Sequence, residues 1–95
     1  MRPSEVLEKN RQAIREATKR FNAANPRVFG SVARGEDRPD LDILVDALPG
    51  STLLTLGGLQ DALEQMMIGT SIYLLTPGDF PESIRTRVLS EAKPI

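Results

Sequence analysis

The stretch from Asp40 to Asp46 limits the possible folds of this chain more than any other part of its sequence. Leu41, Ile43 and Val45 alternate there with Asp40, Asp42, Leu44 and Asp46. Alternation with a period of two is typical of a β-strand that has one face against a core. Asp is depleted in strands, so two carboxylates at the head of an apolar strand need an explanation. We predict a strand over residues 41–45 with one buried face and one acidic face.

The rest of the chain predicts helices and two further strands around this one. We expect helices over residues 4–21, over 52–67 and from residue 79 or 80 onward, a short helix over 31–34, and strands over 27–29 and 71–76. The pair Asn25-Pro26 is expected to end the first helical region, and residues 35–39 to form a loop. A chain of 95 residues has room for one core. We therefore predict a single α/β (α+β) domain over residues 1–95, with a small mixed sheet of about three strands flanked by helices.

The residue types that the chain lacks narrow its chemistry. It has no Cys and no His, which excludes thiolate catalysis, a Ser-His-Asp triad and an imidazole metal site. Any metal would therefore meet oxygen ligands, which favours Mg²⁺ or Mn²⁺ over Zn²⁺. The net charge of −1 and the pI near 5.4 argue against broad binding to nucleic acid. No apolar run approaches the roughly 18 residues of a membrane helix, so we expect a cytoplasmic protein.

The dipeptide Gly30-Ser31 follows a predicted strand and leads into a predicted short helix. Such a turn presents backbone N–H groups to an anion, and the Ser31 hydroxyl adds a hydrogen bond. Gly-Ser is also a common turn dipeptide with no ligand at all. Arg34, three residues later, would face the same side and pair with phosphate oxygens. The alternative is a surface Arg34 that is bonded to Glu36 or Asp37.

The two carboxylates Asp40 and Asp42 form the second candidate group. At positions i and i+2 of a strand they share a face and lie roughly 6.5 Å apart along the chain. This spacing suits two divalent cations about 3.5–4 Å apart, as in two-metal phosphoryl transfer. The alternative is a frayed strand start in solvent. Asp46 shares the face but lies about 13 Å from Asp42, which suggests an ordinary strand-end residue.

A family resemblance rests on these residues together. Residues 28–35 (Val-Phe-Gly-Ser-Val-Ala-Arg-Gly) and 38–46 (Arg-Pro-Asp-Leu-Asp-Ile-Leu-Val-Asp) resemble the signature of the minimal, MNT-type nucleotidyltransferases of the DNA polymerase beta superfamily. The resemblance continues through 56–60, 75–79 and 87–94. It implies that Gly30, Ser31 and Arg34 bind the phosphates of ATP. It further implies that Asp40 and Asp42 are catalytic and hold two Mg²⁺ ions. Family members of this size commonly act as antitoxins beside a HEPN-type toxin, and some transfer AMP to a tyrosine of that toxin.

The chain departs from the family pattern at two places. Tyr73 stands where the family has a third carboxylate, and a neutral phenol is a poor metal ligand and a weak base. The loop between Gly35 and Asp40 is shorter than in the family, and its Glu36 and Asp37 are the nearest acidic replacements. Three functions therefore stay open: an active transferase, an antitoxin that acts by contact alone, and a nucleotide-binding sensor. Tyr73 as a simple packing residue and a homo-oligomeric state also remain open.

Overall fold

A computed structural model of the chain describes residues 2–36 and 38–95. In chain order these residues form α1 (Pro3–Arg20), β1 (Ala23–Phe29), β2 (Asp40–Ala47), α2 (Leu53–Met66), β3 (Ser71–Leu75), the single 3₁₀ turn η1 (Pro77–Asp79), α3 (Glu82–Glu91) and β4 (Lys93–Pro94). The strands make one sheet in the order β3-β2-β1-β4. β2 and β3 are parallel, whereas β1 is antiparallel to both β2 and β4. The predicted mixed sheet flanked by helices is confirmed.

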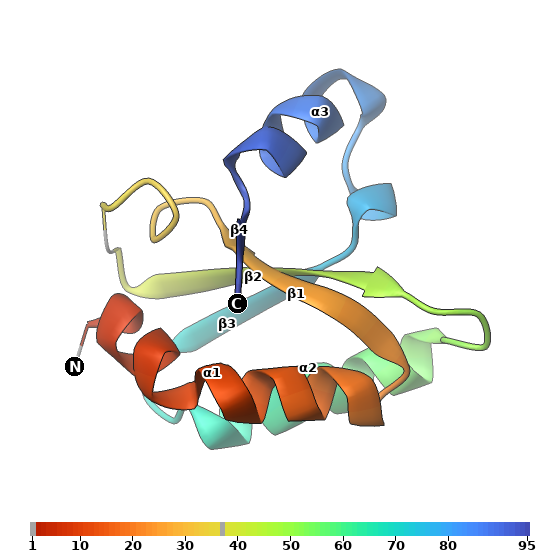
Figure 1. Ribbon diagram of the computed structural model, residues 1–95, viewed down its shortest axis with the longest axis horizontal. Helices are drawn as coiled ribbons and strands as arrows, with labels where there is room; N and C mark the ends of the chain where they lie inside the picture. Colours follow the sequence, from red (N-terminus) through yellow and green to blue (C-terminus); the bar gives the residue numbers. More distant parts are fainter. Residues whose placement is uncertain (1, 37) are drawn as a thin grey trace.

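The core lies between the sheet and two of the helices. Figure 1 shows α1 and α2 on one side of the sheet and α3 on the other. The alternating apolar residues of β2 pack on the helix side, where Leu41, Ile43 and Val45 join Ile14 of α1 and Leu63 of α2 in one buried cluster. Their period of two leaves the acidic residues of β2 on the opposite face. Among the described residues, no helix is long and apolar enough to cross a membrane.

The connection between α1 and β1 differs from the prediction. The helix ends at Arg20, and a turn with Asn22 at a φ of 60° leads directly into β1. Asn25-Pro26, which we expected to end the helical region, lies inside β1 instead. The pairing register of β1 and β2 shifts between Ala24 and Arg27, and Asn25 has a φ of 55° there. A bulge of this kind admits a proline into a strand.

Three other parts of the structure also differ from the prediction. Residues 31–34 form a hydrogen-bonded turn rather than a short helix, closed by the bond from the Arg34 N–H to the Gly30 carbonyl at 3.1 Å. The last helix begins at Glu82, because η1 takes up residues 77–79. The two-residue strand β4 was not predicted, and it adds a fourth strand beside Arg27 and Val28.

The outer edge of β3 is closed by one side chain. Gln60 of α2 donates from Nε2 to the Ile72 carbonyl at 2.8 Å and accepts at Oε1 from the Leu74 N–H at 3.2 Å. These two backbone groups face away from β2, where a further strand would otherwise pair. The Gln60 amide thus takes the place of a neighbouring strand and protects the edge from association.

Replacing Gln60 with Ala should leave both backbone groups of β3 without a protein partner. We expect the free energy of unfolding to fall by about 1–2 kcal/mol, measured by urea denaturation. The variant should also self-associate in a concentration-dependent way, as measured by light scattering. Gln65→Ala is the matched control, because Gln65 lies on the same helix and, among the described residues, its side chain bonds only to the exposed Asp61. Equal effects of the two substitutions would contradict the role of Gln60.

Candidate nucleotide and metal site

The turn after β1 brings the two predicted groups of the site together. Gly30 has a φ of +72°, a conformation that glycine adopts without strain. The carboxylate of Asp42 occupies the space beside its α-carbon: a Cβ added at Gly30 would lie 3.2 Å from Asp42 Cγ and closer still to Oδ2. The register of the sheet explains this contact, because Phe29, the residue before the turn, pairs with Asp42. Only glycine at position 30 lets the turn and the acidic pair approach so closely.

The backbone of this turn offers donors to an anion. Within the described part of the chain, the N–H groups of Val32 and Ala33 make no hydrogen bond, while those of Arg34, Gly35 and Glu36 are used inside the turn. Ser31, the next residue of the turn, is buried, with 6% of its surface exposed. Successive unpaired N–H groups in a tight turn form a concavity that suits a phosphate.

Asp40 and Asp42 both lie on β2 and are both partly buried, so the alternative of a frayed strand start in solvent is excluded. Burial raises the pKa of the Asp42 carboxyl above its ordinary value, and the negative charge of Asp40 adds to this effect. The Arg34 guanidinium acts in the opposite direction. Two carboxylates that repel each other at a partly buried position offer hard oxygen ligands whose mutual repulsion a divalent cation would relieve.

Arg34 lies on the same side as the acidic pair but has other partners. Its Nη2 bonds to Glu36 Oε2 at 3.1 Å, and its Nη1 lies 3.7 Å from Glu91 Oε2 on α3. The hydrogen bond that Arg34 donates to Glu36 raises the pKa of this exposed guanidinium. The alternative of a surface Arg34 paired with Glu36 therefore describes this structure. A phosphate at the turn would compete with Glu36 for the guanidinium.

Tyr73 lies directly beside Asp42. The two residues are register partners in the parallel pair of β2 and β3, and 52% of the Tyr73 surface is exposed. This exposure excludes a simple packing role inside the core. Among the described residues, no group of three acidic side chains is placed to hold a metal. Glu36 pairs with Arg34 instead of replacing the missing carboxylate, and Asp37 lies outside the described residues.

The other acidic residue of this face, Asp46, pairs with a residue that sequence reasoning missed. Arg27 of β1 donates from Nη2 to Asp46 Oδ1 at 3.0 Å, and Asn25 donates to Oδ2 at 3.3 Å. Arg27 is 8% exposed, and its Nε makes no hydrogen bond to any described residue. The hydrogen bond from Arg27 holds the pKa of Asp46 below its ordinary value. Asp46 is thus a structural strand-end residue, as predicted.

Replacing Asp46 with Asn should leave the Arg27 guanidinium without its counter-charge and lower the free energy of unfolding. Because Asp46 is half exposed, we expect a loss of about 1 kcal/mol at neutral pH. A lowered folded-state pKa stabilises the fold above the ordinary Asp pKa of about 3.9, and this contribution is lost as the pH falls through the lower folded value. Urea denaturation of both proteins at several pH values measures this difference.

The difference between the two proteins should be constant near neutrality and shrink in acid. Glu64→Gln, which removes an exposed acid from α2, is the control. A difference that persists unchanged in strong acid would contradict an ion pair as its cause.

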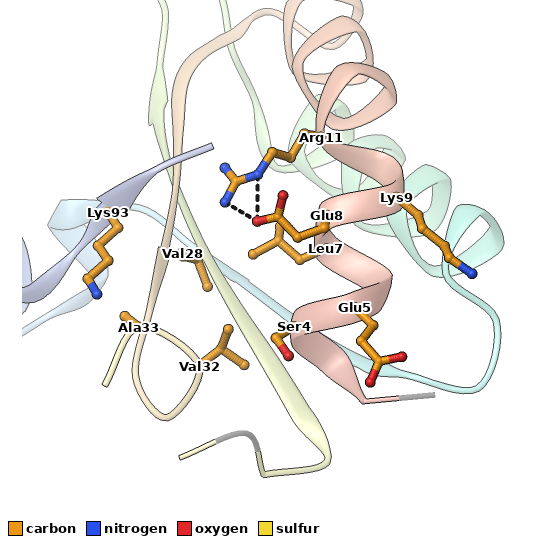
Figure 2. Close-up of a pocket in the computed structure, with 10 residues that line it drawn as sticks. All are labelled: Ser4, Glu5, Leu7, Glu8, Lys9, Arg11, Val28, Val32, Ala33 and Lys93. Carbon is orange, nitrogen blue, oxygen red and sulfur yellow. Dashed lines mark hydrogen bonds and ion pairs between the residues drawn. The ribbon is translucent and has the colours of Figure 1, made fainter. Parts of the chain in front are cut away.

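A separate cavity of about 490 Å³ lies between α1 and the turn (Figure 2). Val28, Val32 and Ala33 form part of its wall, and Leu7 of α1 faces them. At its rim Arg11 of α1 pairs with Glu8 at 2.6 Å. The lining residues include none of Asp40, Asp42 and Tyr73. The cavity adjoins the turn on the helix side, whereas Asp40, Asp42 and Tyr73 lie on the opposite face of the sheet.

Known proteins resemble this chain in sequence and in overall fold. No family model matches the sequence. "Putative protein adenylyltransferase MJ0435" of Methanocaldococcus jannaschii is 37% identical over 67 residues, which are 68% of this chain and 71% of that protein. A solved structure of a "putative minimal nucleotidyltransferase" has a TM-score of 0.86 and 39% identity, and the match covers 97% of this chain and 95% of that one. At this identity over nearly the whole of both chains, this chain belongs to the minimal nucleotidyltransferase family.

Proposed function

We propose that this protein transfers AMP from ATP, with Mg²⁺, to a tyrosine of a HEPN-type toxin and so acts as its antitoxin. One observation carries the proposal: the Asp42 carboxylate lies against Gly30, so the candidate phosphate turn and the acidic pair share one site. The Methanocaldococcus jannaschii relative is named a "putative protein adenylyltransferase", which supports the same reaction class. The toxin as partner follows from the family resemblance of residues 28–46.

The residues present fit a magnesium–nucleotide complex. Asp40 and Asp42 would hold the metal, because carboxylate oxygens are the ligands that Mg²⁺ prefers. Bound there, Mg²⁺ neutralises charge on the triphosphate and on the leaving pyrophosphate. The space that the missing Cβ of Gly30 leaves is filled by Asp42, which sets the carboxylate beside the turn.

The chain's own groups would position the nucleotide. The unpaired N–H groups of Val32 and Ala33 donate to phosphate oxygens and orient the triphosphate over β2. Arg34 exchanges its hydrogen bond with Glu36 for one with phosphate, since both side chains are exposed and their ion pair is weak. Preorganised donors of this kind lower the barrier to transfer because they need no reorganisation in the transition state.

The direct test uses ATP labelled at the α-phosphate, the purified protein and a purified HEPN-type toxin. We expect label on a toxin tyrosine that depends on Mg²⁺ and is lost when EDTA is added. Absence of label from the toxin, with Mg²⁺ and ATP in excess, would contradict transfer.

A second candidate function is neutralisation of the toxin by contact alone. Tyr73 at the position of the third carboxylate favours it, because two carboxylates hold the metal less firmly than three. The two functions differ in one variant. If the protein neutralises by contact, the unmodified chain and Asp42→Asn should protect against the toxin equally well, even without ATP. If transfer is required, the unmodified chain should protect only when ATP and Mg²⁺ are present, and Asp42→Asn should give no protection under the same conditions.

A further inference from the structure

We propose that Tyr73 is itself an acceptor of AMP, so that the protein modifies its own active face. This inference rests on the proposed function and names a second substrate for the same site. Tyr73 is the only tyrosine of the chain, and 52% of its surface is exposed. Within the described residues its hydroxyl makes no hydrogen bond. A tyrosine hydroxyl is the acceptor that the proposed reaction requires, and here one stands in the site.

The sheet places this hydroxyl on the face of the acidic pair. Tyr73 and Asp42 are register partners on neighbouring parallel strands, which are about 4.8 Å apart. Ile72, before Tyr73, is buried in the core cluster, and Leu74, after it, packs against that cluster. Alternation along β3 therefore directs Tyr73 to the opposite face, where Asp42 lies. Closure of the outer edge of β3 by Gln60 holds this strand in place.

The step is balanced with ATP as the only co-substrate. The Tyr73 Oη attacks the α-phosphorus and forms a new P–O bond, while the bond from that phosphorus to the α–β bridging oxygen breaks. Pyrophosphate leaves with that bonding pair, and the phenolic proton passes to water. The product is a phosphodiester between Tyr73 and AMP. Because acceptor and site belong to one chain, the step is intramolecular and benefits from proximity.

Ser71 provides a matched internal control. It is an exposed hydroxyl residue on the same strand, and its register partner is Asp40. A reaction that selected any hydroxyl near the acidic pair would modify Ser71 as well. A reaction specific for the phenol beside Asp42 would leave it untouched.

The experiment incubates the full chain with Mg²⁺ and ATP and measures its intact mass, followed by fragmentation to locate the adduct. We expect one added AMP on Tyr73, formed at a fractional rate that does not depend on protein concentration. Tyr73→Phe and Asp42→Asn should show no adduct, and Ser71→Ala should react as the unmodified chain does. An adduct at any other residue, or a fractional rate that rises with protein concentration, would overturn the intramolecular step at Tyr73.

Calorimetric titration of the same preparation with ATP and Mg²⁺ separates the two proposals. Binding of Mg²⁺-ATP without any Tyr73 adduct would overturn self-modification and leave the proposed function standing. Absence of both binding and adduct would overturn the proposed function and this inference together.

Discussion

Asp42→Asn is expected to abolish the stabilisation that Mg²⁺-ATP gives the protein, while leaving the metal-free fold as stable as before or more stable. The loss follows from removing a metal ligand, so the apparent affinity for Mg²⁺-ATP should fall by at least the roughly 10–100-fold that loss of even an outer-shell partner of a metal costs. The gain follows from the raised pKa of Asp42, which burial and the charge of Asp40 cause. With a raised folded-state pKa, the native state binds the proton more readily than the unfolded chain, so stability falls as the pH rises through that pKa. Asn carries no charge and avoids this loss.

Thermal unfolding with and without Mg²⁺-ATP measures both effects, because a ligand raises stability by RT ln(1 + [L]/Kd). Asp46→Asn is the matched control: it removes an acid from the same face of β2 but breaks the ion pair with Arg27. The two variants should therefore differ in both respects. Asp46→Asn should lower the metal-free stability and keep the response to Mg²⁺-ATP. A full ligand response in Asp42→Asn would contradict the assignment of the site.

Gly30→Ala is expected to damage both the fold and the site. A residue with a Cβ is strained at a φ of +72°, which costs about 1–2 kcal/mol. The added Cβ would also collide with the Asp42 carboxylate, and displacing this partly buried side chain adds a further cost, below the about 1–3 kcal/mol of overpacking a rigid core. Relief of the clash must move Asp42 away from the turn. We therefore expect Mg²⁺-ATP binding to be lost even where the variant remains folded.

Gly35→Ala separates strain from collision. Gly35 has a φ of +80°, close to that of Gly30, but no atom lies within 4 Å of the position of its missing Cβ. This variant should lose only the strain energy of about 1–2 kcal/mol and keep its nucleotide binding. Both free energies come from urea denaturation. Equal losses in the two variants would show that the contact between Gly30 and Asp42 does not matter.

The parts of the fold that the sequence predicted are those that local patterns determine. The alternation of Leu41, Ile43 and Val45 predicted β2 and its buried face, and the helical spacing of apolar residues predicted α1 and α2. In each case a few neighbouring residues carry the information.

The parts that the sequence did not predict depend on residues far apart in the chain. The strand β4 has two residues, one of them a proline, and exists only because β1 offers it an edge. The bulge at Asn25 lets β1 begin earlier than its apolar residues indicated. The pairing of Arg27 with Asp46 needs the register of two strands. A local pattern contains none of these relations.

In the candidate site, too, local patterns predicted some features, and others depend on residues far apart in the chain. The spacing of Asp40 and Asp42 predicted a shared face, and the resemblance of residues 28–46 predicted that Gly30 belongs with them. The contact between Gly30 and Asp42 and the pairing of Arg34 with Glu36 came from the tertiary structure. The roles of Gly30, Ser31, Arg34, Asp40 and Asp42 toward nucleotide and metal stay predictions.

The central claim is that the turn at Gly30 and the pair Asp40–Asp42 form one Mg²⁺-ATP site. Calorimetric titration of ATP into the purified chain, with and without Mg²⁺ and beside Tyr73→Asp, tests it most directly. The account predicts binding by the unmodified chain only when Mg²⁺ is present, and tighter binding by Tyr73→Asp, which restores a third carboxylate. No Mg²⁺-dependent binding by the unmodified chain would contradict the account, and recovery of binding in Tyr73→Asp would then identify Tyr73 as the reason.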